Sequence, residues 1–276
     1  MSFAVAKPKQ RRDPGLPWFI VAVAGLIILF EVAPLVITMG TSVSTTVYPK
    51  FPPTGFTLKW YLAFFRDNQF TGAFWLSIRT ALLTMVFALL LAFPAAYAVS
   101  RFRFPGKQVI RSLVLSPMIV PSVITAVAIL RFYVWIGLGT NTLSLAFGHT
   151  IMALPFAFWM VLVGLERVPV AVEEAARSLG ASRWLTVLRV TLPLAKPGLI
   201  AGGLLAFVAS FDQFMVSMML SGVSQVTLPV QLFLWVRHSS TPMLSAISSL
   251  LILFMIAAVY IIGRTVGFQV FLGRKD

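Results

Sequence analysis

The 276-residue sequence contains no cysteine, only two histidines and only eight acidic residues. Without cysteine the chain can form no disulfide, thiolate nucleophile or Cys-ligated metal centre. The histidines, His149 and His238, have no His or carboxylate partner at ligand spacing, so the sequence predicts no metal site. Charged residues make up 11% of the chain, against about 25% in soluble globular proteins. This shortage of charge excludes a water-soluble enzyme, and the 59% of hydrophobic residues excludes a disordered chain.

Six long apolar runs dominate the sequence. A helix needs roughly 20 apolar residues to cross a hydrocarbon core about 30 Å thick. The runs are apolar on both faces, as in residues 81–98, whereas the strands of a membrane β-barrel alternate apolar and polar residues. The sequence therefore predicts an all-α, polytopic membrane protein with six transmembrane helices, over residues 18–39, 74–99, 109–136, 143–163, 199–220 and 243–262.

The 22 lysine and arginine residues give the chain a net charge of +14. They lie in short clusters between the apolar runs and not on one face or tail, which argues against a nucleic-acid partner. With the N-terminus inside, sixteen of them fall in the inner segments, and the positive-inside rule then predicts that both termini are cytoplasmic. The six in outer or near-outer positions are Lys50, Lys59, Arg66, Arg79, Arg131 and Arg237.

Short connections predict one transmembrane domain, residues 17–265, flanked by a cytoplasmic N-terminal segment, 1–16, and a cytoplasmic C-terminal tail, 266–276. The first apolar run is too long for a signal peptide and lacks a clear small-residue cleavage site, so it is expected to remain as a helix. Two outer connections, 40–73 and 221–242, are long and contain aromatic residues. Each predicts a short helix at the outer interface, which either anchors the chain in the bilayer or forms a docking surface for an external partner.

Proline divides the six runs into two groups. Four runs contain proline, which removes a backbone hydrogen bond and favours a kink. The fifth and sixth runs contain none, so they are predicted to be stiffer. The prolines within the runs are Pro34, Pro94, Pro117, Pro121 and Pro155.

The inner loop between the fourth and fifth runs has the strongest local helix signals. Pro169 suits the first turn of a helix, and Glu173 and Glu174 follow at the positive end of its dipole. Gly180 stands where that helix should end, because a left-handed C-terminal position costs glycine least. Ser182 can then cap a second helix. The loop is therefore predicted to form a helical hairpin on the cytoplasmic face.

This loop, residues 166–198, also carries a family resemblance. Its stretch EEAARSLGASRWLTVLRVTLPLAKPG resembles the E-A-A-x3-G-x9-I-x-L-P signature of inner-membrane permease subunits of binding-protein-dependent ABC importers, with Val190 in place of Ile. The stretches FPPTGFTLKWYLAFF, FPAAYAVSRFRFPGK, SFDQF and VTLPVQLFLWVR are similar to the spermidine/putrescine-type branch. The residues that match the signature are Glu174, Ala175, Ala176, Gly180, Leu192 and Pro193.

The resemblance implies a type I ABC importer permease fold in the bacterial inner membrane. It implies that the chain forms half of a translocation path for a small solute, a polyamine or related cation, delivered by an external, periplasmic solute-binding protein. The implied partners are a second permease subunit and two cytoplasmic ATPase subunits, which hold the ATP and Mg. The loop is then the coupling loop that docks on an ATPase, through Glu173, Glu174, Ala175, Ala176, Gly180, Leu192 and Pro193.

The chain itself is not expected to hydrolyse ATP. A phosphate-binding loop needs G-x4-G-K-[ST], and the Gly-Lys pair at Gly106 and Lys107 has Arg101 at the first Gly position and Gln108 after it. A stand-alone secondary transporter or channel is the alternative function, but it predicts inverted repeats, and the two halves of this chain show no self-similarity. A membrane-embedded enzyme would need a catalytic pair within the spans. His149, in the fourth run, is expected to be a packing or hydrogen-bonding residue.

Two carboxylates fall inside the predicted spans, Glu31 in the first and Asp212 in the fifth. An ionised carboxylate there costs at least about 2.5 to 3.5 kcal/mol on insertion scales, so each needs a partner or a water-filled path. One interpretation is a cation path in which Ser210 and Gln213 flank Asp212. The other pairs the two carboxylates with Arg79 and Arg131. The sequence leaves both interpretations open.

Overall fold

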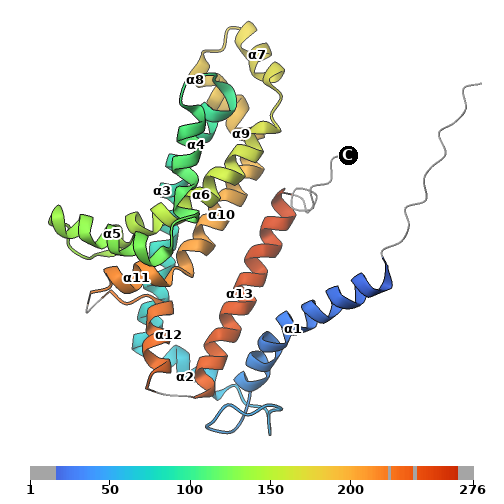
Figure 1. The fold of residues 1–276 in the computed structure, drawn as a ribbon, viewed down its shortest axis with the longest axis vertical. Helices are drawn as coiled ribbons and strands as arrows, with labels where there is room; N and C mark the ends of the chain where they lie inside the picture. Colours follow the sequence, from blue (N-terminus) through green and yellow to red (C-terminus); the bar gives the residue numbers. More distant parts are fainter. Residues whose placement is uncertain (1–16, 223–224, 239–240, 267–276) are drawn as a thin grey trace, which may run out of the picture.

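The computed structural model of the chain describes residues 17–222, 225–238 and 241–266 (Figure 1). Every regular element in these ranges is a helix, and the one β-contact is an isolated bridge between Ser44 and Phe56. The all-α prediction is therefore confirmed. The predicted N-terminal segment, 1–16, lies outside the described residues, as does the predicted tail except for its first residue.

Four of the helices are each long and apolar enough to cross a membrane on their own. Two further pairs of helices reach that length only together, because each pair is bent at a short break. The described ranges thus contain four continuous candidate spans, or up to six if each bent pair counts as one. The four are α1 (Trp18–Ser42), α3 (Asn68–Arg101), α6 (Thr142–Glu166) and α13 (Pro242–Val266).

The predicted third span is broken and not merely kinked. It consists of α4 (Lys107–Leu115), a single 3-10 turn and α5 (Ser122–Trp135), and its two parts meet at 102°. Pro121 holds an extended backbone at the break, where it precedes α5 and cannot donate to α4. Because of this bend, α5 projects away from the bundle (Figure 1). Pro34, Pro94 and Pro155, in contrast, each lie inside one continuous helix.

The second bent pair joins Arg183–Leu194 to the helix that follows it at 72°. The predicted fifth span, residues 199–220, is interrupted at a different place, so the expectation of a stiff helix was wrong. α10 (Lys196–Phe211) ends one residue before Asp212 and Gln213, and α11 (Phe214–Leu220) begins after them. Gln213 has an extended ψ of 99°, which the helix cannot accommodate. No proline marks this break, so composition alone could not predict it.

The centre of the bundle is formed by α3, α6 and α10, which run along one another (Figure 1). Small residues let their backbones touch, as they do in membrane helix pairs. A methyl group on Gly198 would lie 2.7 Å from the Cα of Gly164, and one on Gly202 would lie 2.9 Å from the carbonyl oxygen of Ala157. The same core contains buried alanines of α3 at a four-residue spacing, namely Ala88, Ala92 and Ala96.

Two short helices form in the long connections, as predicted: α2 (Lys59–Arg66) and α12 (Leu228–Val236). They lie at the end of the bundle opposite α7 (Val170–Ser178) (Figure 1). Phe64 of α2 and Leu228 of α12 are buried in one aromatic-rich cluster with residues of α3, α10 and α13. α1 diverges from the bundle (Figure 1), and its main helix contacts are with α13. Most of its apolar side chains are exposed, as expected for a helix that faces lipid or another subunit.

Candidate functional site

A helical hairpin closes one end of the bundle, and its turns are those that the sequence predicts. Pro169 precedes α7, and Gly180 follows it with a φ of +89°, in the left-handed region that favours glycine. The Ser182 hydroxyl accepts a hydrogen bond of 3.3 Å from the Leu185 amide and so caps α8 (Arg183–Thr186). A π-helical turn, Val187–Thr191, and α9 (Leu192–Leu194) then lead into α10.

The two glutamates of α7 have opposite environments. Glu174 is exposed on the outer face of the hairpin, whereas Glu173 is only 3% exposed. The Glu173 carboxylate accepts two hydrogen bonds from Nε of Arg101, at 3.0 and 3.2 Å, and one of 3.0 Å from the Thr191 hydroxyl. Its predicted place on an ATPase-facing surface was therefore wrong, because the side chain points into the subunit.

Arg101 is the residue that fastens the hairpin to the bundle. It is the last residue of α3, and its Nη2 donates to the carbonyl oxygens of Leu165 and Val168, at 3.0 and 2.9 Å. Together with the contacts to Glu173, these bonds join α3, the end of α6 and α7. This pairing could not be predicted from local signals, because Arg101 and Glu173 are 72 residues apart and share no motif.

The exposed face of the hairpin carries the other residues of the signature. Ala175, Gly180 and Pro193 are exposed, while Ala176 and Leu192 are half-buried. Two large apolar side chains that sequence reasoning missed flank the turn: Leu179 is 90% exposed and Trp184 is 71% exposed. Exposed apolar side chains around a rigid turn are typical of a protein–protein contact. Their position on either side of Gly180 is the sequence feature from which their exposure could have been predicted.

The intramembrane carboxylates are unpaired within the described ranges, where Arg101 and Glu173 form the single ion pair. Asp212 and Glu31 are both exposed on the surface of the chain. The alternative in which they pair with Arg79 and Arg131 was therefore wrong. The structure places the two carboxylates at different helices: Glu31 lies on α1, whose main helix contacts are with α13, and Asp212 directly follows α10.

Ser210 does not line a path in this structure, contrary to the prediction. It is 3% exposed, and its hydroxyl bonds to His149 of α6 and to Thr84 of α3. His149 is 1% exposed, and the prediction that it is a hydrogen-bonding residue is confirmed. Gln213, in contrast, is half-buried beside the exposed Asp212.

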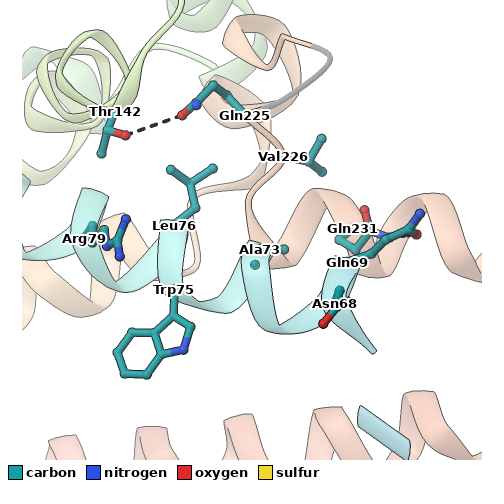
Figure 2. Close-up of a pocket in the computed structure, with 11 residues that line it drawn as sticks. Asn68, Gln69, Ala73, Trp75, Leu76, Arg79, Thr142, Gln225, Val226 and Gln231 are labelled. Atoms are coloured by element: carbon teal, nitrogen blue, oxygen red, sulfur yellow. Dashed lines mark hydrogen bonds between the residues drawn. The ribbon is translucent and has the colours of Figure 1, made fainter. Parts of the chain in front are cut away.

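A cavity of about 640 Å³ lies between the first turns of α3 and the segment that leads into α12. Figure 2 shows side chains of both elements around it, with Thr142 donating a 3.4 Å hydrogen bond to Gln225. None of the described residues that line the cavity is acidic, and its one charge is that of Arg79. Its other polar side chains are those of Asn68, Gln69, Thr142, Gln225 and Gln231.

A bundle of apolar spans with a helical hairpin fastened to one end is an arrangement typical of a membrane transport subunit. Residues 85–268, which include the hairpin, Asp212 and both broken spans, match the family described as binding-protein-dependent transport system inner membrane component. The chain belongs to this family. It is therefore a multi-pass permease of an ABC transport system in the inner membrane.

Relatives of known name include the spermidine/putrescine transport system permease protein PotC of Escherichia coli. It is 32% identical over 213 residues, which cover 76% of this chain and 81% of PotC. A probable molybdenum ABC transporter permease protein of Haloferax volcanii is 36% identical over 189 residues, 66% of this chain and 69% of that protein.

Solved structures show the same fold. A bacterial ABC transporter involved in the import of the acidic polysaccharide alginate superimposes with a TM-score of 0.69 at 21% identity, over 90% of this chain and 95% of that one. The methionine transporter MetNI, in an inward-facing conformation, gives a TM-score of 0.57 at 19% identity, over 72% of this chain and 99% of that one. The chain thus has the fold of type I ABC importer permeases.

Proposed function

We propose that this chain is one of two permease subunits of an ATP-driven importer that carries a polyamine or a related small cationic solute. The observation that carries the coupling part is the hairpin, whose exposed signature face is fixed to the bundle by Arg101. Because Arg101 fixes the hairpin to the bundle, a displacement of the hairpin face is passed on to the spans.

The hairpin face docks on a separate ATPase subunit, where ATP and Mg²⁺ bind. Glu174 pairs with a basic residue of the ATPase, and the small Ala175 and Ala176 let the two backbones approach. Leu179 and Trp184 add apolar contact area on either side of the turn. The complex contains two such ATPases, one for each permease subunit.

The hairpin end of the bundle is cytoplasmic, and both chain termini lie on the same side. The clustering of basic residues around the hairpin supports this orientation, because positive side chains are retained on the cytoplasmic face. The transmembrane domain then spans residues 17–265, with the coupling loop at 166–198. A periplasmic binding protein delivers the solute to the opposite end, near α2 and α12.

The solute passes Asp212 and Gln213, at the break between α10 and α11. An exposed, unpaired carboxylate within a span favours a path for an ammonium group. Glu31 supplies a second carboxylate on α1. The names of two relatives support a polyamine: PotC, described above, and the putrescine transport system permease protein PotI of Escherichia coli, 28% identical over 205 residues, which cover 72% of this chain and 73% of PotI.

A second candidate solute is an oxyanion. The cavity beside Arg79 has one positive charge, several carboxamides and no acidic lining residue among those described, which suits an anion and not an ammonium group. The relative with molybdenum in its name points the same way.

Reconstitution decides between the two solutes. The chain would be purified with its ATPase, second permease and binding protein, placed in liposomes and supplied with ATP and labelled putrescine, spermidine or molybdate. Uptake of a polyamine that requires both ATP and the binding protein is the expected result. Uptake of molybdate alone would establish the second candidate, and ATP-independent uptake by the chain alone would overturn both.

A further inference from the structure

The fifth span is split at Asp212 and Gln213, and a buried histidine of another helix contacts both pieces. His149 lies on α6 and is 1% exposed. Its Nδ1 is 2.9 Å from the Ser210 hydroxyl, near the end of α10, and its Nε2 is 3.0 Å from the Ser217 hydroxyl, in α11. One imidazole ring therefore bridges the break.

The donor and the acceptor of every hydrogen bond in this network can be assigned, because the first bond ends on a carbonyl oxygen that can only accept. The Thr84 hydroxyl donates its single proton to the carbonyl oxygen of Ala146, at 3.2 Å. The Ser210 hydroxyl must then donate to Thr84, at 3.1 Å, which leaves it to accept from His149 Nδ1–H. Nε2 of the neutral ring is left to accept from the Ser217 hydroxyl. A single tautomer thus satisfies all the side chains of the network.

These bonds are hard to replace where they lie. All four side chains are buried, with Thr84 and Ser217 at 0% exposure, so no water is at hand to take over a lost partner. Rotation of α11 against α10 would separate Ser217 from the ring and leave two buried polar groups unpaired. The network therefore favours one angle between the two pieces.

We propose that His149 is a positioning residue, which holds α10 and α11 at a fixed angle and thereby keeps Asp212 and Gln213 open to the solute path. This inference rests on the proposed function for the meaning of that path. His149 also connects the break with the hairpin, because α6 carries His149 in its first half and the carbonyl oxygen of Leu165, bound by Arg101, at its other end. A displacement of the hairpin therefore reaches the break through one helix.

Because the chain has no native cysteine, a single cysteine introduced at the break can be labelled specifically. Gln213→Cys would be introduced as the single cysteine of the chain, in a complex whose other subunits lack reactive cysteines. The rate of modification by a membrane-impermeant methanethiosulfonate would be measured in the wild-type, His149→Leu and Ser217→Ala backgrounds. Because loss of one buried hydrogen bond shifts an equilibrium by roughly tenfold, the rate is expected to change by about that factor in both variants.

Ser249→Ala is the matched control. Ser249 is a buried serine of α13 whose hydroxyl donates to the Ser245 carbonyl of its own helix, so its loss should leave the labelling rate unchanged. The double variant His149→Leu/Ser217→Ala should label like His149→Leu, since both changes remove the same bridge. Additive effects would overturn the proposal, as would wild-type labelling in His149→Leu or in Ser217→Ala.

If the His149→Leu complex does not assemble, the labelling rate of the Ser217→Ala complex tests the proposal by itself. Polyamine uptake by complexes that keep Gln213 gives a second readout, in which His149→Leu should lower the rate while binding of solute to the binding protein is unchanged. If the unsubstituted complex imports no polyamine, the proposed function fails, but the labelling rates still decide whether His149 holds the break.

Discussion

Arg101 and Glu173 form a buried ion pair, with 3.0 Å between Nη2 and Oε1, that joins the last turn of α3 to the first turn of α7. Their side chains are 8% and 4% exposed, so water screens the pair very little. Leu165 and Val168 accept further hydrogen bonds from Arg101, and Thr191 donates one to Glu173. A buried pair is costly to break from one side.

Glu173→Ala should therefore destabilise the chain by about 3–5 kcal/mol, because it leaves Arg101 buried without a counter-ion. The midpoint of thermal unfolding of the purified complex in detergent measures this. Glu166→Ala is the control, since Glu166 is an exposed glutamate at the end of α6 and should have little effect. Equal shifts in the two variants would contradict the role of the ion pair.

Glu174→Lys should act on assembly and not on folding. The side chain is exposed, so the unfolding midpoint of the permease should stay near the wild-type value. The reversed charge should repel the basic partner on the ATPase, and less ATPase should co-purify in mild detergent. Normal co-purification together with wild-type transport would remove Glu174 from the docking surface.

Gly180→Val should disturb the angle of the hairpin. A β-branched residue at a φ of +89° costs about 1–2 kcal/mol or more. Solute-stimulated ATP hydrolysis should then continue with reduced transport per ATP. Gly180→Asn is the matched variant, because asparagine tolerates the left-handed region, and it should retain most of the coupling. If both variants transport like wild type, the turn does not set the coupling.

Asp212→Asn should reduce transport of a cationic solute without a loss of stability. The change keeps size and hydrogen bonding, and Asp212 has no cationic partner to strand among the described residues. Uptake and the unfolding midpoint would be measured on the same purified complex. A lower midpoint with unchanged uptake would show that Asp212 has a structural role and lies off the path.

Local signals in the sequence were sufficient for the helical hairpin. Proline at its start, glycine at its turn and serine at its second cap each act within one or two turns of chain, and Pro169, Gly180 and Ser182 lie where these rules place them. The burial of Glu173 could not be predicted in this way. It depends on Arg101, which only the packing of α3 against α6 brings near.

The breaks in the third and fifth spans also could not be fully predicted from local sequence signals. Pro121 gave a local reason for a kink, although not for its angle of 102°. The break at Asp212 has no proline or other local helix breaker. It is held by His149, which is 61 and 68 residues away in sequence from its two serine partners. Hydrophobicity identifies which residues enter the membrane, but polar contacts between distant spans decide where a span stays helical.

The crossing of α6 and α10 at Gly164 and Gly198 has a mechanical consequence. No side chain separates the two backbones there, since a methyl group on Gly198 would already overlap Gly164. The crossing lies where the chain enters and leaves the hairpin, so α6 and α10 cannot move closer to each other there. If the hairpin docks on an ATPase as proposed, a displacement of its face is expected to tilt both helices together about Gly198.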